Sequence, residues 1–175
     1  GIGEPRTKLL SEFKQYKPGI IRGNASEIIA LAGLWGLEGG EGQSKVRGVD
    51  STDTVSAARE AAIALAKWTG GAIAVSGKTD LVTDGETVAY SYGGSHFMEM
   101  VTGSGCSLGG VAAVYATAAD PFIAALTATA VYNLAGKRAE LRTSAPGSFQ
   151  VAFIDELYIA TAEEIADNPF DIEKA

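Results

Sequence analysis

The chain has very few of the residues that bind metals or form covalent cross-links. Its 175 residues include one cysteine and one histidine. A single cysteine rules out a disulfide framework, and one histidine beside it is too few for a typical zinc site. For a chain with this cysteine usage we expect a reducing, cytoplasmic location.

Positive charge is also scarce. Lysine and arginine together number 14 against 21 acidic residues, which gives a formal net charge of −7. Nucleic-acid binding depends on cationic side chains that neutralise phosphates. This balance therefore argues against a nucleic-acid partner.

An uninterrupted membrane-length apolar run is missing too. Residues 109–135 are long and apolar enough to suggest one, but Asp120 and Pro121 divide the stretch. Aspartate is a favoured helix N-cap, and proline is favoured at the first helical position. We therefore expect two consecutive buried helices here and no membrane partner.

What the sequence does contain is the composition of one globular domain, with 46% hydrophobic and 20% charged residues. Helical spacing of apolar residues predicts helices, short apolar runs predict strands, and Asp84-Gly85 predicts a hairpin turn. Further helices are expected over 6–16, 24–34, 51–68 and 149–160, strands over 20–23, 71–76, 81–83 and 87–92, and a glycine-rich loop over 33–49. This alternation indicates an α/β fold with a mostly parallel sheet covered on both faces.

The most informative motif is the loop Val101-Thr102-Gly103-Ser104-Gly105-Cys106, which runs directly into an apolar helix. Glycines permit a tight loop, and the first helical turn points its free N–H groups and positive dipole end into that loop. Such a site can bind phosphate and stabilise the charge that develops in phosphoryl transfer. Cys106 stands where a thiolate is favoured. The alternative is a glycine-bounded loop with a small packed cysteine.

Further polar groups stand where two predicted strands end. Arg22 closes the first strand and Ser76 the second, at the edge where open α/β sheets bind ligands. A guanidinium there can hold phosphate oxygens, and the Glu27 carboxylate beside a phosphate suits Mg²⁺. The competing interpretation is local, because Asn24 and Glu27 have capping-box spacing and serine before glycine is common in turns.

Three other polar residues receive local interpretations. Asp80 and Asp84 are assigned to the hairpin. His96 lacks a serine or aspartate pattern typical of a catalytic triad, so we interpret it as a loop residue.

In their order along the chain, these motifs resemble the hydroxyethylthiazole kinases of thiamine salvage, members of the ribokinase-like superfamily. The cysteine after Gly-x-Gly is specific, because most ribokinase relatives carry aspartate there as catalytic base. The resemblance implies a ribokinase-like three-layer α/β/α fold. The residues that carry it are Arg22-Gly23-Asn24 with Glu27, Ser76-Gly77 with Asp80, the loop 103–106, Gly1-Ile2-Gly3, Arg47-Gly48-Val49-Asp50-Ser51 and Ala145-Pro146-Gly147-Ser148-Phe149-Gln150.

The resemblance also implies an activity, the ATP-dependent phosphorylation of the primary alcohol of 4-methyl-5-(2-hydroxyethyl)thiazole. Arg22 and Ser76 would contact ATP, Gly103 would lie against the thiazole, and Glu27 would organise Mg²⁺. The anion hole would consist of Gly103, Ser104, Gly105 and Cys106. Cys106 would occupy the base position, and a thiolate suffices there because positioning and charge stabilisation dominate phosphoryl transfer.

Members of that family are longer, and the resemblance places residues 1–175 in the C-terminal portion of one ribokinase-like kinase domain. The N-terminal strands would be missing from this chain, which is then a fragment or is complemented by another chain. A homotrimer with active sites between subunits is the expected assembly. Two alternatives are another ribokinase-like small-molecule kinase, which Cys106 disfavours, and a nucleotide-binding fragment inactive without its N-terminal half. A cysteine hydrolase is disfavoured because no histidine stands near a strand end.

Overall fold

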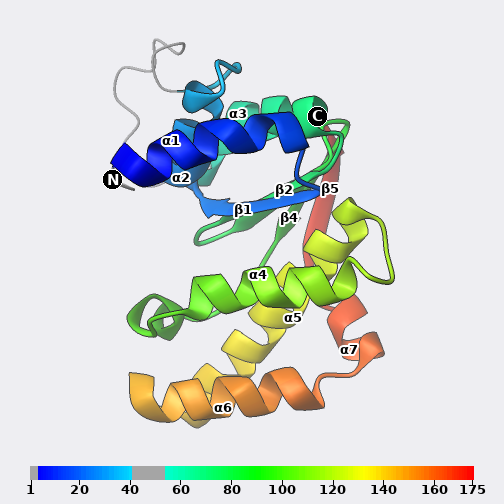
Figure 1. The fold of residues 1–175 in the computed structure, drawn as a ribbon. Coiled ribbons are helices and arrows are strands. Elements are labelled where there is room, and N and C mark those ends of the chain that lie inside the picture. Colours follow the sequence, from blue (N-terminus) through cyan, green and yellow to red (C-terminus); the bar gives the residue numbers. More distant parts are fainter. Residues whose placement is uncertain (1–3, 41–53) are drawn as a thin grey trace.

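The computed structural model describes residues 4–40 and 54–175 and contains one five-stranded sheet between two helical layers (Figure 1). One layer holds α1 (Glu4–Phe13), α2 (Ala25–Leu34) and α3 (Thr54–Thr69). The other holds α4 (Ser104–Tyr115) and α5 (Pro121–Arg142), and α6 (Pro146–Ile159) packs on α5 away from the sheet. The remaining elements are β1 (Ile20–Asn24), β2 (Ala72–Ser76), β3 (Asp80–Thr83), β4 (Thr87–Ser91), β5 (Phe170–Lys174), η1 (Lys14–Tyr16), η2 (His96–Met100) and α7 (Ala162–Ala166). The expected three-layer α/β/α arrangement is confirmed.

The sheet is mixed. In the described residues, β1 and β2 pair in parallel with Asn24 opposite Ser76, whereas β3, β4 and β5 each join antiparallel to the preceding strand. Fewer of the described strand pairs are parallel than the predicted, mostly parallel sheet implies. The connections over residues 77–79 and 84–86 are too short for the crossover that a parallel return requires. β5 was not predicted, because all its residues are exposed and no buried alternation marks it.

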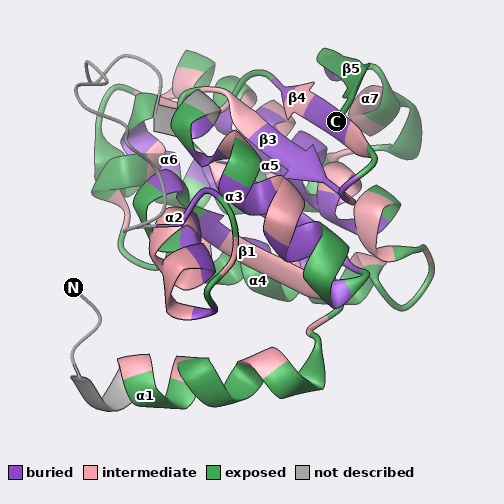
Figure 2. Cartoon of the chain, turned by 90° about the horizontal axis from the view of Figure 1, so that it is seen from above, coloured by how far each residue is buried: buried purple, intermediate pink, exposed green. Residues whose placement is uncertain are grey.

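Successive residues of β2 point to opposite faces of the sheet. Ile73 and Val75 enter the core shared with α2 and α3, whereas Ala72 and Ala74 pack with Ala125 of α5. In Figure 2 the buried residues concentrate in the sheet and the helices directly against it, while α1 shows an exposed outer surface. The small side chains on the α5 side allow that helix to lie close to the strands.

Helix starts follow the predicted capping chemistry. Asn24 forms a complete capping box with Glu27 at the start of α2. Asp120 accepts hydrogen bonds from two backbone amides at the start of α5, where Pro121 takes the first position. α6 begins at Pro146, earlier than expected, because proline again fits the first helical turn.

In the part of the chain described, no helix has the length and apolar character needed to cross a bilayer.

Several sequence predictions fall partly or wholly outside the described residues. They are the motif Gly1-Ile2-Gly3, the glycine-rich loop beyond Gly40, the motif over 47–51 and the expected helix cap over 51–53.

Candidate functional site

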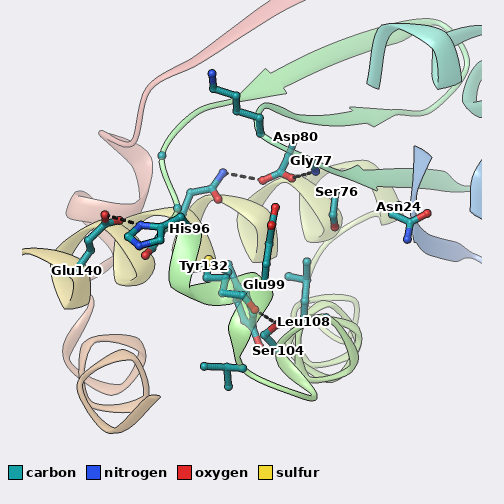
Figure 3. Close-up of a pocket in the computed structure, with 18 of the residues that line it drawn as sticks. Asn24, Ser76, Gly77, Asp80, His96, Glu99, Ser104, Leu108, Tyr132 and Glu140 are labelled. Atoms are coloured by element: carbon teal, nitrogen blue, oxygen red, sulfur yellow. Dashed lines mark hydrogen bonds and ion pairs between the residues drawn. The ribbon is translucent and has the colours of Figure 1, made fainter. Parts of the chain in front are cut away.

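A cavity of about 860 Å³ opens at the carboxyl ends of β1 and β2 (Figure 3). Its walls come from these strand ends, the β2–β3 turn, the segment between β4 and α4, the first turn of α4, and α5. Parallel pairing brings the two strand ends to one edge of the sheet. This is the edge where α/β folds bind ligands, as the sequence predicted.

The Arg22 side chain is the main cationic group of this cavity. Its Nη2 donates to Ser76 Oγ at 3.2 Å, so the parallel register of the two strands holds the two side chains together. The guanidinium also lies against Gly105, where an added Cβ would come within 2.7 Å of Nη1. Arg22 Nε is buried and has no hydrogen-bond partner among the described residues. Buried donors without a partner are uncommon in folded proteins, so this atom sets Arg22 apart from an ordinary structural arginine.

The first turn of α4 supplies backbone donors beside this guanidinium. Gly103 is the N-cap, with a φ of +92° that favours glycine, and it offers no capping side chain. The Ser104 hydroxyl donates to the Met98 carbonyl at 2.8 Å and thereby fixes the preceding loop to the helix. In the described chain, no acceptor pairs with the amides of Gly105 and Cys106. These N–H groups and the helix dipole therefore remain available to an anion.

The predicted anion-hole residues are only partly exposed to the cavity. Ser104 and Gly105 line it, whereas Gly103 and Cys106 do not. The Cys106 side chain is exposed on the neighbouring surface of the helix. The structure thus brings Arg22, Ser76, Ser104 and Gly105 together, with Cys106 adjoining them in sequence.

Glu27 does not line this cavity. Its Oε2 accepts the Asn24 amide at 2.8 Å, while Asn24 Oδ1 accepts the Glu27 amide at 2.9 Å. The residue lines a second groove of about 750 Å³ between α1, β1 and α2, and Arg22 lines both spaces. The capping role is therefore directly visible, and the metal-binding role stays a prediction.

Asp80 closes the wall next to Ser76. Its Oδ1 accepts the Gly77 amide at 2.9 Å, and its Oδ2 accepts Asn133 Nδ2 at 2.9 Å. Burial raises the pKa of the Asp80 carboxyl, while these hydrogen bonds and the Arg22 charge act in the opposite direction. Asp84 accepts the amides of Glu86 and Thr87, which confirms its predicted role in the hairpin.

Comparisons with known proteins identify one family. The model of the hydroxyethylthiazole kinase family matches residues 1–163. This chain belongs to the hydroxyethylthiazole kinase family. Among its relatives, the hydroxyethylthiazole kinase of Bifidobacterium longum (strain DJO10A) is 48% identical over 186 residues, covering 96% of this chain and 59% of that protein. The hydroxyethylthiazole kinase of Corynebacterium glutamicum (strain R) is 47% identical over 171 residues, covering 95% of this chain and 60% of the relative.

The fold comparison agrees with this assignment. A solved structure of hydroxyethylthiazole kinase protein from Pyrococcus horikoshii OT3 matches with a TM-score of 0.82 and 24% identity. The match covers 100% of this chain and 62% of that one. It confirms the ribokinase-like fold. The chain spans about 59% of the length of the Bifidobacterium relative.

For this member of the hydroxyethylthiazole kinase family, the structure adds cavity residues that sequence reasoning missed. His96 Nδ1 lies 2.9 Å from Glu140 Oε1, and both residues line the cavity together with Glu99. Figure 3 places His96 and Glu140 at the opposite end from Ser76. His96 and Glu140 are 44 positions apart, so no local spacing signals their contact.

Metal ligands do not gather in the same way. Within residues 4–40 and 54–175, no group of three histidine, cysteine, aspartate or glutamate side chains is placed to hold a metal ion.

Proposed function

We propose that this chain binds Mg²⁺–ATP in the cavity and takes part in phosphorylating the primary alcohol of 4-methyl-5-(2-hydroxyethyl)thiazole. One observation carries the proposal. In a chain of the hydroxyethylthiazole kinase family, the Arg22 guanidinium lies against Gly105, beside the unpaired first-turn amides of α4. The positive charge of Arg22 and the free amides of α4 therefore lie side by side, and both kinds of group bind phosphate.

The triphosphate would lie at the strand ends. Arg22 offers its guanidinium, and Lys78 lines the same cavity. The Ser76 hydroxyl accepts from Arg22, so its own proton remains free to donate to a phosphate oxygen. Charge-assisted contacts of this kind bind phosphate more strongly than neutral ones do.

The charge distribution supports one orientation of the nucleotide. Glu140 stands with His96 at the end away from Ser76, whereas Asp80 lies at the Ser76 end beside the Arg22 charge (Figure 3). Carboxylates repel phosphates but accept hydrogen bonds from ribose hydroxyls and base amino groups. The nucleoside would therefore occupy the His96–Glu140 end.

In the reaction, the alcohol oxygen would bond to the γ-phosphorus while the bond between that phosphorus and the bridging oxygen breaks, which releases ADP. Cys106, as thiolate, would take the alcohol proton, and the amides of Gly105 and Cys106 would stabilise charge on the transferred group. Gly103 has no side chain and is exposed, which supports close approach of the thiazole.

Magnesium suits this arrangement as a companion of the nucleotide. Mg²⁺ keeps several waters and is usually bound by one or two carboxylates together with phosphates, so a full protein cage is unnecessary. Glu27 Oε2 serves the α2 cap, which leaves Oε1 for the metal or its water. When bound, the ion would neutralise phosphate charge. The homotrimer, the cytoplasmic location and complementation by another chain stay predictions.

Arg22→Ala tests the nucleotide site. We expect the Kd for Mg²⁺–ATP, measured by isothermal titration, to rise about 100-fold because charge-assisted bonds are lost. Arg59→Ala is the matched control, because Arg59 pairs with Glu173 and does not line the cavity. Equal losses in both variants would contradict the proposed site.

Cys106→Ala tests the chemical step. We expect ADP release with hydroxyethylthiazole to fall by about 10²–10⁴ in kcat, with ATP affinity unchanged. Turnover equal to that of the unmodified chain would exclude Cys106 as the base. ATP binding by the unmodified chain without ADP release would favour the nucleotide-binding alternative, and a panel of alcohols would detect a different substrate.

A further inference from the structure

Asn133 is a buried polar residue at the centre of α5, with 4% of its surface exposed. Its Nδ2 donates to Asp80 Oδ2 at 2.9 Å and to Ser91 Oγ at 3.0 Å. Its backbone carbonyl accepts the Gly94 amide at 2.9 Å. One residue therefore ties α5 to the start of β3, the end of β4 and the loop that follows β4.

The contact with Asp80 reaches the proposed phosphate site in two further steps. The other oxygen of Asp80 accepts the Gly77 amide at 2.9 Å. Gly77 follows Ser76, whose hydroxyl accepts from Arg22 Nη2 at 3.2 Å. Figure 3 shows Asp80, Gly77 and Ser76 side by side along this wall.

The hydrogen bonds of the Asn133–Asp80 pair restrict which side chains can replace Asn133. The side-chain amide of Asn133 has two hydrogens, and each of them has an acceptor. A carboxylate in its place would face the Asp80 carboxylate, and an apolar side chain would leave a buried acceptor unsatisfied. Close packing enforces the geometry, because a Cβ added to Gly93 would lie 3.1 Å from the Asn133 Cβ.

We propose that Asn133 is a positioning residue, which through Asp80 holds the Ser76–Gly77 turn and thereby sets the Arg22 guanidinium toward the triphosphate. The inference rests on the proposed function for its catalytic meaning. It goes beyond that function because it assigns the alignment of Arg22 to a residue of α5, which reaches Arg22 only through Asp80, Gly77 and Ser76.

Exchanging the two side chains gives the sharpest test. Asp80→Asn places two amide groups face to face, and Asn133→Asp places two carboxylates face to face. In the double variant, the new amide at 80 can accept from Gly77 and donate to the new carboxylate at 133, while the Ser91 hydroxyl donates to that carboxylate. We expect each single variant to raise the Kd for Mg²⁺–ATP about tenfold and the double variant to recover to within about threefold.

Asn168→Leu is the matched control. Asn168 is equally buried, at 5% exposure, and donates to the Tyr92 carbonyl at 3.1 Å and to Ser91 Oγ at 3.5 Å, but it has no contact with Asp80 and does not line the cavity. We expect it to lower the melting temperature while leaving ATP affinity unchanged. A loss of affinity equal to that of Asn133→Asp would overturn the proposal.

Amide hydrogen exchange at Gly77 supplies a readout that does not depend on the nucleotide. We expect faster exchange in both single variants and restored protection in the double variant. If the unmodified chain fails to bind Mg²⁺–ATP, the proposed function fails, and the Gly77 exchange still decides whether Asn133 holds the turn. Unchanged exchange in both single variants, or no recovery in the double variant, would overturn the inference.

Discussion

The two faces of the sheet are built for different purposes. Toward α2 and α3 the strands present large apolar side chains, such as Ile73 and Val75, which pack into a continuous core. These two residues belong to β2, and toward α5 the same strand presents Ala72 and Ala74. The polar cavity lies beyond the carboxyl end of β2. In β2, alternate side chains therefore contribute to the hydrophobic core on one face and to the packing of α5 beside the site on the other.

Buried polar groups follow the same division. Most of the buried polar residues lie on the α5 side of the molecule, and all of these except Thr129 form hydrogen bonds to another segment of the chain. They are Ser91, Thr129, Asn133, Glu156 and Asn168. The apolar face stabilises the fold by burying side chains without directional bonds. On the cavity face, hydrogen bonds fix the positions of the polar side chains.

The largest effect is expected from truncating the apolar face. Leu65 of α3 is 0% exposed within the core that packs on Ile73 and Val75. Leu65→Ala should lower the free energy of unfolding by about 2–5 kcal/mol, because it removes buried methyl groups and leaves a cavity. Urea titration measures this change. The ATP affinity of the folded fraction should stay constant, and a weaker affinity at unchanged stability would break the division between the faces.

On the cavity face, Gly105→Ala should give the opposite result. The added Cβ would come within 2.7 Å of Arg22 Nη1, and the flexible guanidinium must move away. We expect ATP affinity to fall about tenfold or more through weakened charge-assisted bonds, with little loss of stability. Gly109→Ala is the control in the same helix, because its Cβ would meet nothing within 4 Å. That control should gain roughly 0.5–1 kcal/mol and keep its affinity.

Glu27→Gln tests whether a residue on the α2 side of the sheet contributes to Mg²⁺-dependent ATP binding. Glutamine can keep the capping box, so the melting temperature should stay almost unchanged. If Glu27 also organises the metal, the Mg²⁺ concentration needed for half-maximal ATP binding should rise several-fold. A variant that loses stability but keeps its magnesium dependence would leave capping as its whole role.

The sequence predicted those parts of the molecule that depend on local pattern. The capping residues Asn24 and Asp120, the hairpin at Asp84-Gly85 and the end of β2 at Ser76 all follow from neighbours within a few positions. Arg22 was expected to close the first strand, but β1 continues to Asn24. The α/β class followed from the same alternation of apolar segments.

What the sequence did not predict depends on contacts between distant segments. His96 meets Glu140 across 44 positions, and Asn133 meets Asp80 across 53. β5 pairs with β4 although all its residues are exposed, so its sequence lacks the alternation of apolar and polar residues that predicts a strand. Gly105 was assigned to the anion hole, but its close approach to Arg22 required the register of β1 and the placement of α4.

The smallest effect is expected from a half-buried ion pair between α5 and α7, away from the cavity. Arg138 Nη2 donates to Glu164 Oε1 at 2.6 Å, and the Thr161 amide donates to Oε2 at 2.9 Å. These bonds, with that from Arg138 the larger cause, lower the pKa of Glu164 from 4.5 to about 2. Because the folded-state pKa lies below the unfolded value, the stabilisation is complete above about pH 4.5 and is lost as the pH falls toward about 2.

Glu164→Gln should therefore have a slightly lower melting temperature than the unmodified chain at pH 7, and the difference should close as the pH falls toward about 2. Glu163→Gln is the control, because Glu163 stands in the same first turn of α7 without an ion-pair partner among the described residues. A difference between Glu164→Gln and the unmodified chain that stays constant across this range would assign the effect to the α7 cap alone. ATP affinity should be the same in all three proteins, since neither glutamate lines the cavity. A change in ATP affinity in either variant would show that charges outside the cavity also contribute to nucleotide binding.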